Sequence, residues 1–300
     1  MRLKARIRRW LQNPRVEPGR FDNIESPWDW DHYPQGSDSP AICNICWWAG
    51  SSFDGYQHSE SAVCPGCSSI ARDRFLFYCF IRTTPRPGAS LSVLETSPRL
   101  GDEYRDAMAR WFDYQASDFD LRAHRADIQL DLQDIEMESE SQDTILSPHV
   151  LEHVPDTGRA LSEIHRVLKP GGRMYLQVPV LQGWTAPPEV PEFHGDQTPV
   201  MWRFGFDLTE RLRDQGFETR LHCTAGFRSL VACKARTWPD PPGLEFDLPD
   251  MLTAAELDDL FPVADEEAAR RLGWTPGYMF LTWEARKQTA PVPAKRKAAT

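Results

Sequence analysis

Short apolar segments alternate with amphipathic ones from residue 91 onward, and this alternation limits the fold more than any other feature of the sequence. The apolar segments predict strands at 91–95, 113–117, 126–132, 144–147, 173–180, 217–224 and 278–286. The amphipathic segments predict helices at 102–112, 158–168 and 206–215. Strands that alternate with helices pair in parallel, and the helices then cover both faces of the sheet. We therefore expect an α/β, Rossmann-like domain.

Changes in composition divide the chain into four expected units. They are a basic irregular arm (1–40), a cysteine-rich module with a linking helix (41–84), the α/β domain (88–286) and a disordered basic tail (287–300). Within the α/β domain, the acidic and Pro-containing stretch 235–275 indicates an insertion, with one helix at 254–260. The tail is rich in Ala, Pro and Lys, and such segments cannot bury enough apolar surface to fold.

The charge of the chain is −10, and it is unevenly distributed. Residues 1–20 hold seven basic residues and one acid, whereas residues 286–300 hold five basic residues and no acid. The middle of the chain is therefore strongly acidic, which argues against a broad nucleic-acid-binding face. No apolar run is long enough to span a membrane, and the basic start lacks the apolar core of a signal peptide. These features favour a cytoplasmic protein and leave its oligomeric state open.

Two C-x2-C pairs near the N-terminus predict a metal site. Cys43 and Cys46 form the first pair, Cys64 and Cys67 form the second, and seventeen residues separate them. Four thiolates at this spacing fill the tetrahedral coordination sphere of Zn²⁺ and leave no position for water, so the site would be structural. The remaining cysteines lack such spacing and are expected to pack in the core: Cys79, Cys223 and Cys233.

Polar residues follow the predicted strands, where open parallel sheets bind their ligands. An acid after the second strand suits a ribose diol, and an acid after the third suits an adenine amine, so a nucleoside cofactor is expected. Each acid taken alone could equally be a solvated loop carboxylate. The candidate cofactor-binding residues are Glu95, Thr96, Ser97, Gly101, Asp118, Asp131, Leu132 and His149.

A long motif after the fourth strand closely resembles one family. The segments 145–156 (ILSPHVLEHVPD) and 160–172 (ALSEIHRVLKPGG) resemble the class I S-adenosylmethionine (SAM)-dependent methyltransferases of the type 11 group. The cysteine pairs, the following RDRFL (72–76) and the late RLGW (271–274) are similar to a subgroup with an N-terminal zinc ribbon. The resemblance covers about residues 41–287 and implies a seven-stranded sheet whose last strand is antiparallel.

The resemblance also implies roles for individual residues. Glu95 and Gly101 match the first cofactor motif, with Glu95 near the methionine or ribose end of SAM. Asp118 matches the acid that binds the ribose, and Asp131 matches the acid next to the adenine. His149 falls in the loop that lines the methyl-donor pocket.

The first cofactor motif departs from the family pattern E-x-G-x-G. Ser97 and Arg99 occupy the two glycine positions. Glycine there lets the backbone approach the cofactor closely. The departure motivates an alternative function, a non-catalytic scaffold or binding protein with the same fold. A similar loss is found in the zinc-ribbon subgroup, which favours SAM binding.

Methyl transfer from a sulfonium to oxygen or nitrogen needs a general base only if the acceptor must lose a proton. The candidate bases are His149, His153 and His194. His194 lies in a Pro-rich loop and could equally be a surface residue, while His153 could simply pack and cap its turn. A further variant uses His149, Glu152 and His153, which resemble the acid-acid-His set that holds a divalent metal in some quinone-biosynthesis O-methyltransferases.

Three functions are compatible with these patterns. The leading one is a methyltransferase that acts on a small-molecule or sugar-type acceptor. The second is an RNA methyltransferase, because a family of ribosomal RNA guanine methyltransferases also pairs a zinc module with this fold, although the acidic middle of the chain weighs against it. The third is the non-catalytic scaffold.

Overall fold

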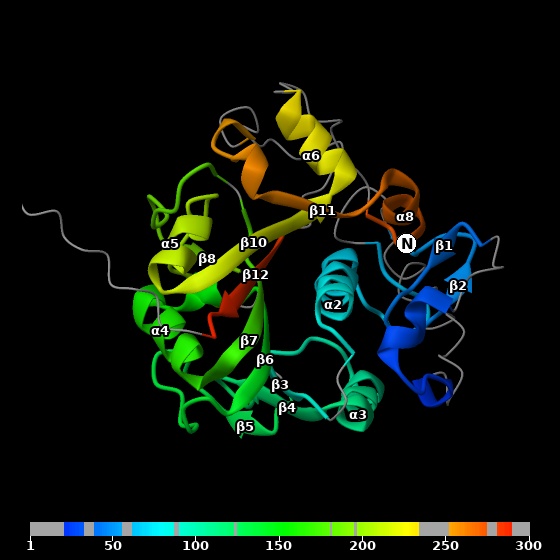
Figure 1. Cartoon of the computed structure of the whole chain (residues 1–300), viewed down its shortest axis with the longest axis horizontal. Coiled ribbons are helices and arrows are strands. Elements are labelled where there is room, and N and C mark those ends of the chain that lie inside the picture. The colour runs from blue at the N-terminus through cyan, green and yellow to red at the C-terminus, as the bar shows by residue number, and fades with distance from the viewer. Residues whose placement is uncertain are drawn as a thin grey trace, which may run out of the picture.

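A central sheet of eight strands organises the described part of the chain (Figure 1). In this computed structural model the described residues are 21–32, 39–55, 62–86, 90–122, 125–180, 182–194, 197–233, 252–274 and 281–289. The sheet has the order β11-β10-β12-β7-β6-β3-β4-β5. Its strands are β3 (Ser92–Thr96), β4 (Asp113–Asp118), β5 (Ile128–Gln129), β6 (Gln142–Pro148), β7 (Leu168–Gln177), β10 (Phe217–Thr224), β11 (Leu260–Ala264) and β12 (Thr282–Lys287).

The strand pairing and the helix layers confirm the expected Rossmann-like α/β fold. Strand β12 runs antiparallel to both of its neighbours, β10 and β7, and the other pairs in the sheet are parallel. Figure 1 shows α2 and α3 on one face of the sheet and α4 and α5 on the other. The helices are α2 (Ala71–Thr83), α3 (Asp102–Trp111), α4 (Thr157–Val167), α5 (Leu208–Asp214), α6 (Ala225–Ala232) and α8 (Glu266–Arg271). Among the described helices, none has the length and apolar character needed to cross a membrane.

The largest difference from the predicted secondary structure lies at 254–260, where a helix was expected. Leu257–Asp259 form a single 3-10 turn, and Leu260–Ala264 become β11, which pairs in parallel with β10 and adds an eighth strand. Leu260 and Ala264 are buried, whereas the residues between them are more exposed, as suits a strand at the edge of a sheet. Pro262 has no backbone N–H to donate and is tolerated there because one side of an edge strand is unpaired.

Other boundaries also differ from the expected ones. The third strand is much shorter than expected, since only Ile128–Gln129 pair, and α6 was not expected. Helix α6 begins at Thr224, whose hydroxyl accepts a hydrogen bond from the backbone N–H of Phe227. Most of the expected basic tail and the first half of the basic arm lie outside the described residues.

Residues 21–32, the described end of the basic arm, pack against the helices. They form two 3-10 turns, η1 (Phe21–Asn23) and η2 (Pro27–His32). The indole N–H of Trp111 in α3 donates to the carbonyl of Ile24 at 2.9 Å, and the indole N–H of Trp28 donates to the carbonyl of Thr84 at 3.0 Å. Phe21 and Ile24 are buried, so this stretch belongs to the core.

The cysteine module lies on the outer side of α2 and is joined to it by Arg74 (Figure 1). The module contains a short antiparallel pair, β1 (Ala41–Ile42) and β2 (Ala49–Gly50). The Arg74 side chain is 0% exposed and donates hydrogen bonds to the carbonyls of Ala62, Ser69 and Leu272 at 2.9, 2.7 and 3.1 Å. Its guanidinium carbon also lies 3.9 Å from the centroid of the Phe53 ring. One cation therefore connects the cysteine module, the start of α2 and the segment after α8.

The RLGW segment completes this junction. Trp274 is fully buried and its indole N–H donates to the carbonyl of Ala71 at 3.1 Å, while its ring packs edge-on against Phe75 at 5.0 Å. Gly273 has φ +75°, and a Cβ atom there would lie 2.7 Å from the Phe53 ring. Glycine is therefore required between Leu272 and Trp274 on both conformational and steric grounds.

We predict that Arg74→Met lowers the free energy of unfolding by about 3 kcal/mol or more, because three buried carbonyls lose their donors. Urea denaturation measures this change. Arg82→Met, an exposed arginine on the same helix, is the matched control and should change stability by less than about 0.5 kcal/mol. Equal effects of the two substitutions would contradict the assigned role of Arg74.

Candidate functional site

The carboxyl ends of β3, β4 and β6 are joined by short hydrogen bonds at one edge of the sheet. The backbone N–H of Ser97 donates to the carbonyl of Ser117 at 2.6 Å. The hydroxyl of Thr96 donates to the hydroxyl of Ser147 at 3.2 Å. Thr96 and Ser97 were predicted to bind the cofactor, whereas Ser117 and Ser147 were predicted only as the last residues of their strands. A small polar residue near the end of each apolar strand is the sequence pattern that could have indicated them.

In the turn from β3 into α3, Ser97 and Arg99 occupy the family's two glycine positions, and Ser97 has a backbone conformation that glycine favours. Ser97 has φ +47°, in the left-handed region that glycine favours. Gly101 precedes α3, and a Cβ atom at that position would meet nothing within 4 Å. Arg99 extends to Asp73 on α2, with its Nη2 atom 3.2 Å from the Asp73 carboxylate and its side chain 37% exposed. The turn therefore leaves the N-terminus of α3 open.

Glu95 is buried beneath this turn between two tyrosines. One oxygen of its carboxylate accepts hydrogen bonds from the hydroxyls of Tyr114 and Tyr104, at 2.8 and 3.1 Å. Burial raises the pKa of Glu95 to about 7, although the two tyrosine hydrogen bonds oppose the rise. The sequence indicated Glu95 but neither tyrosine, because they lie on α3 and β4 and meet the carboxylate only after folding.

Two further acids lie at adjacent strand ends, each oriented by its own turn. The Asp118 carboxylate is buried and accepts a hydrogen bond from the N–H of Asp120 at 2.8 Å. The Asp131 carboxylate accepts one from the N–H of Gln133, also at 2.8 Å. The N–H of Leu130 donates to the carbonyl of Asp118 at 2.9 Å and so connects the two turns. Leu132, also expected in the cofactor site, is buried in the hydrophobic core.

The loop after β6 brings His149 against α2. His149 has φ +52°, and its N–H donates to the carbonyl of Gln177 at 2.8 Å. Its Nδ1 atom lies 3.3 Å from Nη1 of Arg72 and 3.5 Å from Oε1 of Glu152. The start of α2 therefore forms one wall of the loop that carries the expected methyl-donor residue.

Glu152, His153 and His194 meet at the outer side of the same loop. The Oε1 atom of Glu152 lies 3.9 Å from Nε2 of His153, and the rings of His153 and His194 are 4.9 Å apart. His194 comes from the turn between β8 (Glu192–Phe193) and β9 (Pro199–Val200). Two of the three expected bases are therefore neighbours, and His149 lies near the same oxygen of Glu152 as His153 does.

The four cysteines of the two C-x2-C pairs converge on one point. The Sγ atoms of Cys43 and Cys67 lie 3.7 Å apart, and those of Cys46 and Cys64 lie 3.6 Å apart. Tetrahedral zinc with bonds of about 2.3 Å requires sulfurs about 3.8 Å apart, so the residues fit this ion. The residue after each pair, Trp47 or Ser68, has a left-handed backbone, and its N–H donates to the carbonyl of the first cysteine of its pair.

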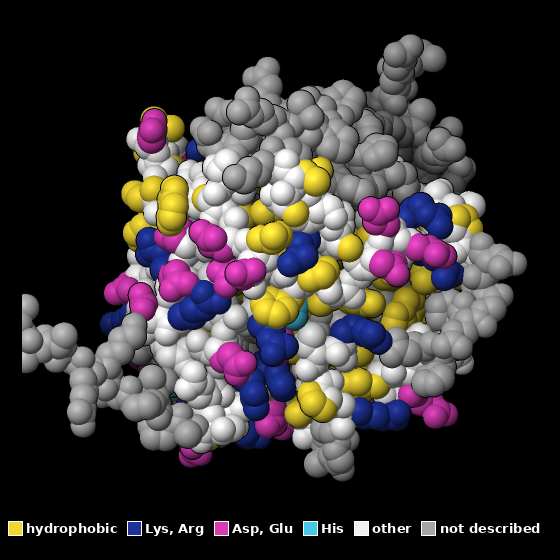
Figure 2. All heavy atoms as spheres, turned by 45° about the horizontal axis from the view of Figure 1, so that its top comes forward, with side chains coloured by type: hydrophobic (Ala, Val, Ile, Leu, Met, Phe, Trp, Pro, Cys, Tyr) yellow, Lys and Arg dark blue, Asp and Glu magenta, His cyan; other side chains and the backbone are white. Residues whose placement is uncertain are grey.

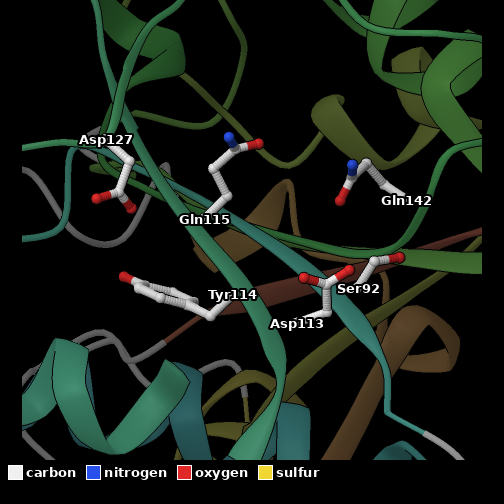
Figure 3. Close-up of a pocket in the computed structure, with 6 residues that line it drawn as sticks. All are labelled: Ser92, Asp113, Tyr114, Gln115, Asp127 and Gln142. Atoms are coloured by element: carbon white, nitrogen blue, oxygen red, sulfur yellow. The ribbon is translucent and has the colours of Figure 1, made fainter. Parts of the chain in front are cut away.

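A polar pocket of about 270 Å³ lies elsewhere, at the opposite end of the strands (Figure 3). Ser92, Asp113 and Gln142, three of its six lining residues, are the first residues of β3, β4 and β6. None of the expected cofactor residues lines this pocket. Its lining differs from the candidate site, although Tyr114 belongs to the lining and also donates to Glu95.

Comparison with known proteins agrees with the sequence motifs. Residues 104–176 match the family described as "Methyltransferase domain", which confirms the resemblance to class I SAM-dependent methyltransferases for this segment. The comparison with curated proteins gave no match.

Solved structures similar to this chain include two methyltransferases. One is the 1,6-didemethyltoxoflavin-N1-methyltransferase of Burkholderia thailandensis, at 15% identity and a TM-score of 0.39, over 73% of this chain and 78% of that one. The other is a SAM-dependent methyltransferase of Mesorhizobium loti, at 16% identity and a TM-score of 0.40, over 72% of this chain and 100% of that one.

We predict that Glu95→Gln removes a pH dependence of stability. Below about pH 4.5 the carboxyl is protonated in both states; between 4.5 and about 7 only the folded state keeps the proton, so stability falls as the pH rises. Relative to Glu95→Gln, the wild-type protein should lose roughly 3 kcal/mol across this range and no more above it. Urea denaturation at a series of pH values tests this. The control Glu103→Gln, at an exposed residue of α3, should show the same pH dependence of stability as the wild type. If Glu95→Gln also shows the same pH dependence as the wild type, the prediction is contradicted.

Proposed function

We propose that this protein is a SAM-dependent methyltransferase that transfers a methyl group to an oxygen or nitrogen of a small-molecule or sugar-type acceptor. The observation that carries the proposal is the family match over 104–176, which includes α3, β4 and β6. These are the elements whose ends gather the acids and the His149 loop at one edge of the sheet.

The residues at this edge suit the parts of SAM. Asp118 would accept hydrogen bonds from the two ribose hydroxyls, and its turn already orients the carboxylate. Asp131 would accept a hydrogen bond from the adenine amine. The turn from Ser97 to Gly101 would receive the methionine end, because its left-handed backbone and open helix terminus match those of a glycine turn. The buried residues Glu95 and Thr96 would pack beneath this turn, and the buried Leu132 would pack beneath the residues that bind the adenine.

SAM supplies an electrophilic methyl group, so the chain's task is to align the acceptor with it. The loop of His149 and the β8–β9 turn with His194 would enclose the acceptor. His149, His153 and His194 are the groups that would accept a proton from an acceptor hydroxyl or amine. The Nδ1 atom of His153 lies 2.7 Å from the carbonyl of Pro199. This contact assigns the proton to Nδ1 and leaves the Nε2 atom as an acceptor.

A small acceptor is favoured over RNA by the distribution of charge. The chain carries a net charge of −10, and on the face shown in Figure 2 acidic side chains lie beside the basic ones. A polynucleotide-binding protein would instead carry an excess of basic residues on the binding face. Ser97 has φ +47°, in the region that glycine favours, and this supports the methyltransferase over the scaffold alternative.

We further propose that the four cysteines bind a structural Zn²⁺ ion. Four thiolates saturate the ion, so it would stabilise the module and take no part in methyl transfer. Metal-bound thiolates and buried free cysteines suit the reducing conditions of the cytoplasm, where we expect the protein to act.

The cofactor site is tested by calorimetric titration of the zinc-loaded protein with SAM and with S-adenosylhomocysteine. We expect both to bind, and Asp118→Ala to weaken binding roughly 10- to 100-fold, because two hydrogen bonds to a charged group are lost. Asp113→Ala, at the exposed opposite end of β4, is the matched control and should bind as the wild type does. A folded protein that binds neither compound would exclude the methyltransferase and favour the scaffold.

The zinc site is tested by Cys46→Ser. We expect this substitution to abolish stoichiometric zinc and to lower the temperature of thermal unfolding, since a three-thiolate site binds the ion more weakly and metal binding stabilises the folded state. Elemental analysis and thermal denaturation measure the two effects. Cys233→Ser, at an exposed cysteine, should change neither. Unchanged zinc content in Cys46→Ser would exclude this ligand set.

A further inference from the structure

We infer that Glu152, His153 and His194 bind a divalent transition-metal ion at the acceptor side of the candidate cofactor site. One ligand atom from each residue lies within 4.8 Å of the others. The role of this ion in catalysis rests on the proposed function. The binding of the ion by these three residues does not depend on that function.

The Glu152 carboxylate needs a cation. The residue is 1% exposed, and within the described part of the chain neither carboxylate oxygen has a hydrogen-bond partner. A buried carboxylate without donors is strongly unfavourable unless a positive charge compensates it. His149, 3.5 Å away, compensates it only when protonated. A metal ion would compensate the carboxylate while both neighbouring imidazoles stay neutral.

The His153 ring is oriented as a metal ligand. Its Nδ1 atom lies 2.7 Å from the carbonyl of Pro199, so in the neutral ring the lone pair is on Nε2, the nitrogen measured nearest to Glu152. A hydrogen bond from the second ring nitrogen to a carbonyl is the usual support of a metal-bound histidine. The Nε2 atom lies 3.9 Å from Oε1 of Glu152, a separation that ligands on one ion with bonds of about 2.1 Å can have.

Backbone hydrogen bonds hold the third ligand beside the other two. The N–H groups of Met201 and Trp202 both donate to the carbonyl of Glu152, at 2.8 and 3.1 Å, and so fasten the end of the β8–β9 hairpin to the Glu152 turn. Within the hairpin, the N–H of His194 donates to the carbonyl of Thr198 at 2.9 Å. His194 is exposed, and its candidate ligand nitrogen lies within 4.8 Å of the ligand atoms of Glu152 and His153.

The ligand set indicates both the kind of ion and its accessibility. Two imidazoles and one carboxylate suit Zn²⁺, Fe²⁺, Co²⁺ or Ni²⁺, whereas Mg²⁺ prefers oxygen ligands. Three protein ligands leave coordination positions open, and the exposed His194 marks the side from which another molecule could bind. An acceptor oxygen bound there would lose its proton more readily. With His153 and His194 bound to the ion, His149 would be the base that accepts this proton, because a nitrogen bound to a metal cannot also take up a proton. This ligand set therefore favours acceptors that carry a hydroxyl group.

The site is tested by titrating the zinc-loaded protein with Co²⁺ and recording visible absorption. A nitrogen and oxygen site gives weak ligand-field bands, whereas Co²⁺ that displaces zinc from the four cysteines adds intense thiolate charge-transfer bands. We expect one Co²⁺ site with nitrogen and oxygen ligands, seen as weak ligand-field bands. His194→Ala and Glu152→Gln should weaken it by at least the roughly 10- to 100-fold that loss of an outer-shell partner costs.

His165→Gln is the matched control, because His165 is half-buried against Phe217 near the C-terminal end of α4 and should leave Co²⁺ binding unchanged. His194→Ala alters an exposed side chain and therefore keeps the test valid if Glu152→Gln does not fold. No ligand-field bands in the wild type, or equal Co²⁺ affinity in His194→Ala and His165→Gln, would overturn the inference. Co²⁺ binding without SAM binding would support the metal site and exclude methyl transfer; the reverse result would overturn the metal site alone.

Discussion

The buried guanidinium of Arg74 is the interaction on which the arrangement of the whole molecule depends. A buried cation is tolerated only when its donors are satisfied, and those of Arg74 bind the carbonyls of Ala62, Ser69 and Leu272. These carbonyls belong to the cysteine module, the approach to α2 and the segment after α8. Because all three must meet one rigid planar group, their relative positions are determined within narrow limits.

The cysteine module consequently acts on the candidate site through α2. Arg74 lies in the first turn of α2, next to Arg72 and Asp73, which contact His149 and Arg99. The module therefore supports one wall of the site although its own four thiolates lie elsewhere. The zinc ion that we propose would in this way support the proposed reaction without taking part in it.

Much of the fold could be predicted from the sequence, because α3, α4 and the first half of β10 each carry a regular apolar pattern within one continuous segment. The sequence could not reveal β11, since a short edge strand that contains Pro262 has no such pattern. The candidate site was predictable wherever a residue follows a strand, as with Asp118. It was not predictable where distant segments meet: Tyr104 and Tyr114 on Glu95, and His194 beside Glu152.

The position of β12 has a consequence for how the chain acquires its structure during synthesis. This strand lies between β7 and β10, and it is the last strand of the sheet to leave the ribosome. Until it emerges, β10 and β11 can pair with each other but have no neighbour that joins them to β7. If both halves form before then, the nascent chain holds two half-sheets with unpaired edges, the kind of surface that chaperones protect. The sheet can close only after β12 has been translated.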